Sequence, residues 1–426
     1  MTKNNTAQQN IPNGWQSTFV DDICYVMKGQ GLSKKDIDPS GKNKCVLYGE
    51  LFTTYDEVIE DVKSRTNSNA GIPSVNGDIL IPGSTTTVAR DLAIASALNE
   101  NAVLLGGDIN ILRKKADSYD PNFLAYYLTH YKKNEIGKLG QGTTIVHLYG
   151  SNIKNLEIVI PKSKKEQKKI AEILGAVDED IAKTQGVIEA TEKLKRGLMQ
   201  QLFTRGIGHT KFKETKIGQI PKEWDVVSIR NSSIKLIDGD RGTNYPKQED
   251  FSPEGFCLFL SAKNVSKNGF IFDEASFISQ EKDRALRKGK LERGDIILTS
   301  RGTVGNVAYY DEKISFDNIR INSGMLIVRH GDQFDPVFLY RYFSSPQMEA
   351  KYSSMGSGSA QPQLPVGSLE QVEIPLIPIS EQREIANIIS AVNEKILINK
   401  KLKEKLTLLK KGLMQDLLSG RVRVKN

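Results

Sequence analysis

The sequence predicts an α+β fold in which two similar α/β domains, called heads below, are separated by an antiparallel two-helix coiled coil with a pseudo-two-fold internal repeat. The first observation is a duplication with a period of about 215 residues (410 − 195 = 215; 294 − 77 = 217). Three short stretches return in the same order: residues 77–79 at 294–296, 166–171 at 381–386 and 195–200 at 410–415. A repeat of this length indicates two copies of a whole domain together with its connector.

The second observation is a pair of stretches, each of about 40 residues, in which apolar residues recur at alternating spacings of three and four. Such spacing, sustained over about five heptads, is typical of a coiled coil. The predicted seam of the first helix contains Ile170, Leu174, Val177, Ile181, Val187, Ile188, Leu194, Leu198 and Leu202. That of the second contains Ile385, Ile389, Val392, Ile396, Leu402, Leu406, Leu409, Leu413 and Leu417. Thr184 and Asn399 are polar seam positions, which more often set register than bind a ligand.

A chain of 426 residues suits two domains with connectors. We expect five parts: a flexible N-terminal lead at 1–10, a first head at 11–161, a first long helix at 162–206, a second head at 207–379, and a second long helix with a C-terminal tail at 380–426. The first helix must carry the chain from one head to the other. The second begins at the second head, so antiparallel pairing returns the C-terminus to the first head.

Each head combines short apolar runs, broken by glycine and proline, with helical segments. Asp120-Pro121 and Asp335-Pro336 are helix start signals because Pro suits the first helical position. The aromatic residues that follow each signal are expected to lie in the core. The second long helix follows Pro378, and we expect Ser380 to cap it, with Glu381 next.

The charge of the chain is concentrated in the helical segments. The net charge is +8, and residues 162–206 and 380–426 together carry +9. A basic excess indicates nucleic acid, although a lysine-rich solvated helix face explains it equally well. No stretch is long and apolar enough for a membrane span, and residues 1–10 show no signal peptide. Three scattered cysteines favour a reducing cytoplasm.

No catalytic or metal-binding motif is evident. The sequence contains no phosphate-binding glycine loop and no Cys-x-x-Cys, and its four histidines lack metal-ligand spacing. Asp335 with Glu349 and Lys351 superficially matches a nuclease metal site. The first repeat keeps Asp120 but loses the Glu-x-Lys spacing, which argues against that site. We therefore expect no catalytic residue, no metal and no cofactor bound by this chain.

The duplicated plan resembles the specificity subunit of type I restriction–modification enzymes over almost the whole chain. The motifs that carry the resemblance are the two Lys-Arg/Lys-Gly-Leu-Met-Gln endings, Leu417–Val422, the openings Ile11-Pro12-x-x-Trp15 and Ile220-Pro221-x-x-Trp224, and the stretches Gly77–Leu80 and Gly294–Ile297. No single motif is decisive, but all of them occur in order and twice.

The resemblance implies that each head is a target-recognition domain reading one half of a split, asymmetric double-stranded DNA sequence, and that the helices set the unread gap. It implies that the subunit has no activity of its own. It would recruit two methyltransferase (modification) subunits, which use S-adenosylmethionine to methylate adenine N6, and two restriction/translocase subunits that use ATP and Mg²⁺.

Base reading is expected from head loops that offer Arg, Lys, Asn, Gln, Ser, Thr or Tyr, although each is equally well an ordinary turn. The candidates in the first head are Tyr48, Tyr55, Ser84, Thr85, Thr86, Gln141, Thr143 and Thr144. Those in the second head are Lys263, Asn264, Arg301, Thr303, Ser357, Ser359 and Gln361. Arg301 is the strongest, because its forked guanidinium suits guanine or phosphate.

Two other functions fit the same pattern. One is a stand-alone bipartite DNA-binding protein without enzyme partners, which a neighbouring methyltransferase gene would argue against. The other is a coiled-coil scaffold joining two protein-binding heads, which would show no steep loss of DNA binding with salt.

Overall fold

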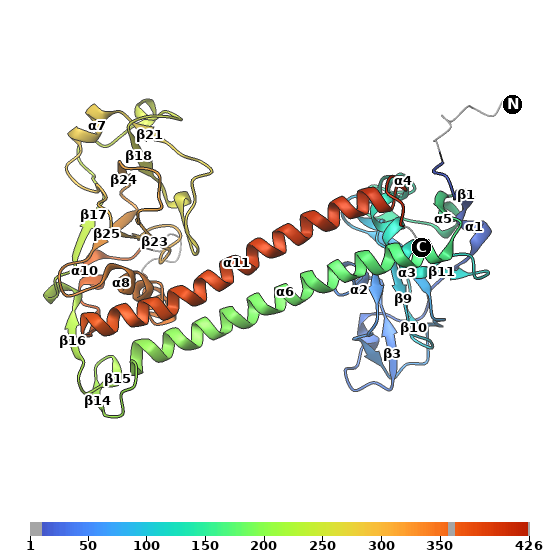
Figure 1. Ribbon diagram of the computed structural model, residues 1–426, viewed down its shortest axis with the longest axis horizontal. Coiled ribbons are helices and arrows are strands. Elements are labelled where there is room, and N and C mark those ends of the chain that lie inside the picture. The colour runs from blue at the N-terminus through green and yellow to red at the C-terminus, as the bar shows by residue number, and fades with distance from the viewer. Residues whose placement is uncertain (1–10, 357–362, 425–426) are drawn as a thin grey trace. The chain divides into compact units, whose positions relative to one another are not determined.

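The computed structural model describes residues 11–356 and 363–424, which form two compact units. Unit 1 comprises the chain up to Gln185 together with Lys401 onward, and unit 2 comprises Gly186–Lys400. Each unit contains one head and about half of each of two long helices, α6 (Lys164–Arg205) and α11 (Ile379–Leu417) (Figure 1). Because α11 begins at Ile379, Ser380 lies inside the helix and does not cap it.

The described part of the unit 1 head contains four small sheets. They are β1–β13 (Trp15–Phe19, Glu157–Pro161), β5–β3–β10–β6 (Arg65–Thr66, Asn43–Val46, Leu104–Leu105, Ile72–Pro73), β2–β11–β7–β9–β4 (Cys24–Lys28, Ile109–Lys114, Asp78–Pro82, Ser96–Leu98, Val58–Ile59) and β12–β8 (Val146–His147, Ser84–Thr85). Its short helices are α1 (Val20–Ile23), α2 (Glu50–Thr53), α3 (Pro121–Tyr126), a π-helical turn (Tyr127–Tyr131), α4 (Lys133–Lys138) and α5 (Gly150–Lys154).

The head of unit 2 is built from five small sheets in the described residues. They are β14–β15 (Phe212–Thr215, Gly218–Pro221), β16–β26 (Asp225–Ser228, Glu373–Leu376), β17–β25–β22–β23 (Lys235–Asp238, Met325–Arg329, Ile296–Thr299, Val307–Tyr309), β21–β18–β24 (Phe277–Ile278, Cys257–Leu260, Ile319–Ile321) and β19–β20 (Val265–Ser266, Gly269–Phe270). Its short α-helices are α7 (Gln280–Ala285), α8 (Pro336–Phe343), α9 (Pro346–Met355) and α10 (Val366–Glu370).

The two heads share one topology. The order β2–β11–β7–β9 in unit 1 corresponds to β17–β25–β22–β23 in unit 2, with antiparallel pairing throughout. A parallel pair also recurs, as β3 with β10 and as β18 with β24. Unit 1 differs by adding β4 parallel to the edge strand β9. The predicted duplicated α/β fold is therefore confirmed.

The repeated Gly-Asp-Ile motif closes a turn and buries an ion pair in each head. Gly77 and Gly294 adopt φ values of 87° and 91°, which favour glycine. The next residue, Asp78 or Asp295, is 1% exposed and receives two guanidinium bonds from the arginine of an adjacent strand, Arg113 or Arg329. The motif thus fixes two neighbouring strands of each main sheet.

The Asp-Pro signals begin helices as predicted, and the aromatic residues after them lie in the cores. Asp120 accepts the Phe123 backbone N–H at the start of α3, and Asp335 accepts the Phe338 backbone N–H at the start of α8. Phe123, Tyr127, Phe338 and Phe343 are fully buried. Because the carboxylate of Asp335 caps α8, it is occupied structurally rather than available as a metal ligand.

The repeated Glu-Gln pair docks each long helix on its head. Gln167 is fully buried, accepts the Asp120 backbone N–H and donates to the Pro161 carbonyl. Gln382 makes the matching bonds with Asp335 and the Ile377 carbonyl. In each unit, one glutamine side chain thereby accepts a backbone N–H of the head and donates to a backbone carbonyl just before the long helix. This double role explains why glutamine recurs at this position.

The C-terminal tail bonds to the start of α6 in unit 1, and the segment after α6 bonds to the start of α11 in unit 2. In unit 2, Glu381 accepts bonds from Trp224 Nε1 at 2.9 Å and the Ile207 N–H at 2.9 Å. In unit 1 its counterpart Glu166 forms two bonds, 2.6 and 2.7 Å long, with the guanidinium of Arg423. The return of the C-terminal segment to the first head is therefore confirmed.

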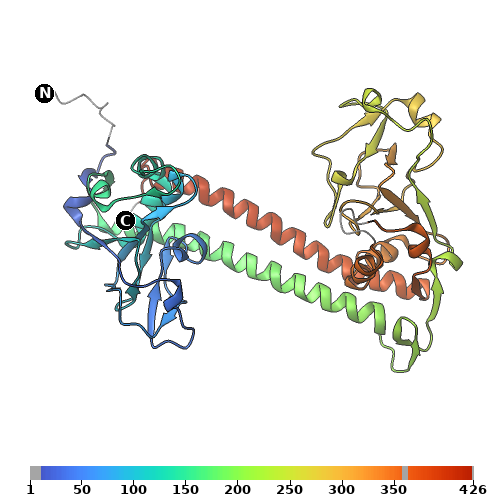
Figure 2. The same ribbon diagram turned by 180° about the vertical axis from the view of Figure 1, so that it is seen from behind.

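The long helices pair antiparallel within each unit (Figure 1 and Figure 2). In unit 1, Lys410 lies 2.6 Å from Asp178 and Lys403 lies 3.0 Å from Gln185. Residue numbers therefore rise along α6 in the direction in which they fall along α11. In unit 2, Lys400 reaches Glu192 at 2.8 Å.

The predicted apolar seam is correct at most positions along both helices and wrong at four. The buried seam residues are Ile170, Leu174, Ile188, Leu202, Ile385, Ile389, Ile396 and Leu417. The partly buried ones are Val177, Ile181, Leu198, Val392, Leu406 and Leu413. Four residues predicted for the seam are exposed instead: Val187 (40%), Leu194 (55%), Leu402 (45%) and Leu409 (50%). A strict heptad drifts about 20° per repeat on a straight α-helix, which rotates such positions away from the partner helix.

Candidate nucleic-acid interface

The structure brings two predicted loops of unit 1 together. Strand β8, with Ser84 and Thr85, pairs with β12, and Gln141 forms a bridge with His147 of β12. Ser84 is buried and its hydroxyl donates to Asp108, whereas Thr85 bonds the Thr87 hydroxyl at 2.8 Å. The exposed side chains of this surface are Thr86, Gln141, Thr143 and Thr144.

The two predicted tyrosines flank α2 in the chain. Tyr48 is 42% exposed. Tyr55 is partly buried, its hydroxyl accepts the Lys63 N–H at 2.9 Å, and burial raises its pKa to about 12. Tyr48 is therefore free to contact a ligand, whereas the hydroxyl of Tyr55 holds a neighbouring loop.

In unit 2 the Arg301–Thr303 turn lies next to the segment that begins at Gln363. Arg301 forms a bridge with Gln363, and Gly302 adopts a φ of 74°. The guanidinium Nε of Arg301 is buried without a hydrogen-bond partner among the described residues. Thr303 is exposed in a shallow hollow that Lys267, Asn306 and Ser353 also line. The predicted residues Ser357, Ser359 and Gln361 lie outside the described residues.

The Lys263–Asn264 turn is largely structural. Asn264 is 3% exposed, its amide donates to the carbonyls of Ile271 and Glu274, and its oxygen accepts the Ser261 N–H. Lys263 is exposed and pairs with Glu274 at 3.0 Å.

A basic loop that the sequence analysis missed begins in the last turn of α7. The side chains of Arg284, Arg287 and Lys288 are exposed, and none of them forms an ion pair or a hydrogen bond with another described residue. Residues 282–290 hold five cations, which is the signal that could have revealed it. We define the basic loop as residues 284–288. Unpaired cations on a head surface are the groups that phosphate contacts require.

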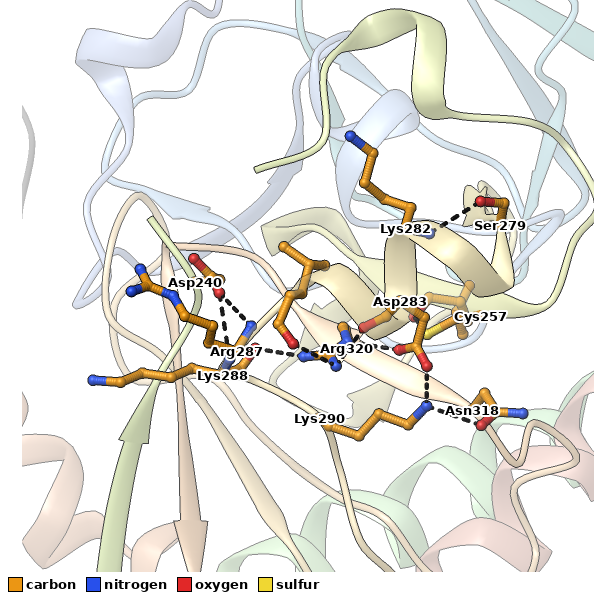
Figure 3. A network of polar contacts seen from close by, with 12 residues as sticks. Asp240, Cys257, Ser279, Lys282, Asp283, Arg287, Lys288, Lys290, Asn318 and Arg320 are labelled. Atoms are coloured by element: carbon orange, nitrogen blue, oxygen red, sulfur yellow. Dashed lines mark hydrogen bonds and ion pairs between the residues drawn. The ribbon is translucent and has the colours of Figure 1, made fainter. Parts of the chain in front are cut away.

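A buried polar network holds the backbone of the basic loop (Figure 3). Arg320 of β24 donates to the Asp283 carboxylate at 2.6 Å and to the carbonyls of Asp283, Leu286 and Lys288. Asp240 accepts the backbone N–H groups of Arg287 and Lys288. The charges of Arg320 and Asp240 are thus used inside the protein, while those of the basic loop are presented to solvent.

Both carboxylates of this network are stabilised in their charged form. The backbone N–H of Gly242, followed by those of Arg287 and Lys288, holds the pKa of Asp240 below its ordinary value. Burial alone would raise the pKa of Asp283, but hydrogen bonds from Lys290 and Arg320 outweigh it and lower that pKa. The network is therefore charged at neutral pH.

Among residues 11–356 and 363–424, no group of three or more His, Cys, Asp or Glu side chains is placed to hold a metal ion. No helix within these ranges combines the length and apolarity needed to cross a bilayer.

Comparison with known families decides what these heads are. The family model of the type I restriction modification DNA specificity domain matches residues 12–193 and again 221–408, so that both repeats are covered. This chain belongs to the type I restriction–modification DNA specificity family. It is a DNA sequence-specificity subunit of such a system.

Individual members of the specificity family are similar over most of the chain. The type I restriction enzyme MjaVIII specificity subunit of Methanocaldococcus jannaschii is 30% identical over 98% of this chain and 95% of its own length. The EcoBI specificity subunit of Escherichia coli is 21% identical over 75% and 72%. The crystal structure of the type I restriction–modification S subunit from M. genitalium matches with a TM-score of 0.60 at 20% identity, covering 97% and 98%, and supports the fold.

Membership of the family gives the head surfaces a common purpose, sequence-specific contact with DNA. The main sheets of the two heads have the same strand order. Their candidate surfaces differ, because unit 1 exposes small hydroxyl and amide side chains and unit 2 exposes the basic loop. The individual candidate residues stay predictions.

Proposed function

We propose that each head reads one half of a bipartite, asymmetric double-stranded DNA sequence. The observation that carries this proposal is that one framework occurs twice on the chain with different exposed loops. Two heads with the same exposed loops would favour a palindromic DNA target. Among the described residues the basic loop occurs in unit 2, so the two heads favour an asymmetric target. The major groove is where all four base pairs can be distinguished, so the exposed loop side chains would be inserted there.

We also propose that the two long helices determine the gap between the half-sites. Helix α6 has 42 residues and α11 has 39, and each runs without interruption. A helix of that length extends over roughly 60 Å at 1.5 Å per residue. Once one head has bound, the other meets its half-site at a high effective concentration.

The chain itself is proposed to be non-catalytic and to recruit two methyltransferase subunits that methylate adenine N6 with S-adenosylmethionine. Since adenine is stacked within the duplex, these partners would flip it out before methylation. Two restriction/translocase subunits using ATP and Mg²⁺ would join them for restriction. A cytoplasmic location accompanies this role.

An exposed apolar stripe on each long helix supports the recruitment of two partners. In unit 2 the stripe consists of Val187, Leu194 and Gly197; in unit 1 it consists of Leu402, Leu409 and Gly412. Members of the two stripes stand at matching positions of the repeat, 215 residues apart (402 − 187 = 215). A Cβ at Gly197 or Gly412 would meet nothing within 4 Å in the described structure.

These helical glycines have no steric justification within the described chain, yet each costs about 1 kcal/mol relative to alanine in a helix interior. Close approach of another helix explains them, because the absent side chain leaves room for it. We propose one methyltransferase helix on each stripe.

The experiment that tests this function is co-purification with the methyltransferase subunit of the same restriction–modification system, followed by mass measurement of the complex. The wild-type chain is expected to bind two copies, and Leu194→Asp or Leu409→Asp one copy each, because a carboxylate on an apolar contact is costly to bury. Lys193→Asp is the control for surface charge and is expected to retain two copies.

Unchanged stoichiometry in both leucine variants would rule out the stripes as docking surfaces. A wild-type chain that binds DNA specifically and no methyltransferase would favour the stand-alone bipartite DNA-binding protein instead.

A further inference from the structure

The two repeats differ in charge where each head meets the helix pair. In unit 1 this junction is neutralised by carboxylates. Lys410 of α11 lies 2.6 Å from Asp178 of α6 and 3.4 Å from Glu57 of the head. Tyr126 donates to Asp178 at 2.6 Å, and His130 lies 2.5 Å from Glu57. The lysine is therefore matched by two carboxylates of its own chain.

The matching positions of unit 2 carry cations and an amide. The residues 215 positions from Lys410, Asp178 and Tyr126 are Lys195, Asn393 and Arg341 (410 − 195 = 393 − 178 = 341 − 126 = 215). Among the described residues neither Lys195 nor Arg341 forms an ion pair. The guanidinium contacts the Ser390 hydroxyl at 3.4 Å and the ring of the neighbouring Tyr340, 4.8 Å from its centroid, and neither group is a carboxylate.

Buried donors remain unused at this junction. Arg341 Nε and Asn393 Nδ2 are both buried without a hydrogen-bond partner in the described structure. Burial, followed by the charge of Arg341, lowers the pKa of Lys195, and burial lowers that of Arg341. Two partly desolvated cations and an unused amide donor are a costly arrangement unless an acceptor arrives from outside.

The nearby carboxylates do not fill this role. Glu192 pairs with Lys400 at 2.8 Å, and Glu349 is exposed on α9. The segment that supplies Glu57 in unit 1 leads into β4, and the matching sheet of unit 2 ends at β23 without a counterpart of that strand. Within the described residues, unit 2 thus has no counterpart of the acidic element that unit 1 contains.

We propose that the α6–α8–α11 junction of unit 2, formed by Lys195, Arg341 and Asn393, binds a carboxylate supplied by an acidic segment of a protein partner. A carboxylate is the group that the other repeat places at the matching position. A protein source is favoured because Leu194 and Gly197, the exposed apolar stripe of unit 2, flank Lys195 in the sequence. Nucleic acid would offer phosphate but no apolar surface to cover that leucine.

The test uses Asn393→Asp in the full-length chain, which installs the carboxylate that Asp178 provides in unit 1. The internal carboxylate is expected to occupy the cations and to repel the incoming one. Affinity for the methyltransferase subunit, taken as the partner, should fall on the order of tenfold or more at unit 2. Arg341→Tyr, which copies Tyr126, should act in the same direction. Lys193→Gln is the control for net charge and should bind as the wild type does.

Inorganic phosphate serves as a probe of the site itself. At constant ionic strength it should raise the melting temperature of the wild type and leave that of Asn393→Asp unchanged. Equal responses in the two proteins would overturn the site. A phosphate response without any change in partner affinity would mean an adventitious ion only, and a loss of duplex DNA binding with unchanged partner binding would assign the site to DNA. Both results would overturn the proposal.

The choice of the methyltransferase subunit as partner rests on the proposed function. The experiment distinguishes a failure of that function from a failure of the carboxylate site. A wild-type chain that does not bind the methyltransferase contradicts that function. Wild-type binding that Asn393→Asp and Arg341→Tyr leave intact contradicts the carboxylate site alone.

Discussion

Arg320→Met is expected to lower the free energy of unfolding of unit 2 by about 3–5 kcal/mol, the range found when one partner of a buried ion pair is removed. Arg320 is 6% exposed and Asp283 5%. The substitution keeps the length of the side chain but removes the donors to one carboxylate and three carbonyls. Chemical denaturation at neutral pH measures the difference.

The control for this prediction is Lys263→Met, which removes an exposed ion pair with Glu274. Exposed pairs contribute little because solvent screens them, so no measurable change is expected. If Lys263→Met and Arg320→Met had equal effects, the buried network would not hold the basic loop.

The dependence on pH follows from Asp283, whose pKa is lowered in the folded protein. A carboxylate of lowered pKa contributes stability above its unfolded value of about 3.9, and this contribution is lost as the pH falls through the folded value. The difference between wild type and Arg320→Met should therefore be largest near neutral pH and should narrow in acid.

Replacing all three cations of the basic loop, Arg284, Arg287 and Lys288, with alanine is expected to weaken binding to the full DNA target on the order of 10²–10³-fold at about 50 mM salt. The plot of log affinity against log salt should become less steep by about 2.7, since each phosphate contact contributes about 0.9. Titration of labelled duplex at several salt concentrations measures both quantities.

A matched control removes the same charge elsewhere. Lys162, Lys165 and Lys168 are exposed near the start of α6 and can be replaced together by alanine. If net charge alone attracted DNA, both triple variants would lose affinity equally. A specific contact requires the loss in the loop variant and near-wild-type binding in the control.

The duplication, the helix starts and the long helices could be predicted because they follow local rules. Asp-Pro before an aromatic run specifies a helix start, and the Glu-Gln pair recurs because one glutamine satisfies backbone groups in each unit. These are short-range signals that sequence displays directly.

The basic loop and the true helix seam could not be predicted because they depend on distant residues. Arg287 and Lys288 are presented by contacts with Asp240 and Arg320, both more than 30 positions away. Likewise, heptad spacing identified Leu194 and Leu409 as seam residues, but only the pairing of the helices shows that both are exposed. Spacing identifies a stripe without saying which surface covers it.

The most direct test of the account selects bound sequences from a random duplex library, with the wild type and with a variant carrying four extra residues in each long helix, after Thr184 and after Asn399. The account predicts two dissimilar short words at a fixed gap for the wild type. It predicts the same words with a gap longer by about two base pairs for the variant, since four helical residues add about 6 Å and each base pair about 3.4 Å. One continuous or palindromic word, or altered words at an unaltered gap, would contradict it.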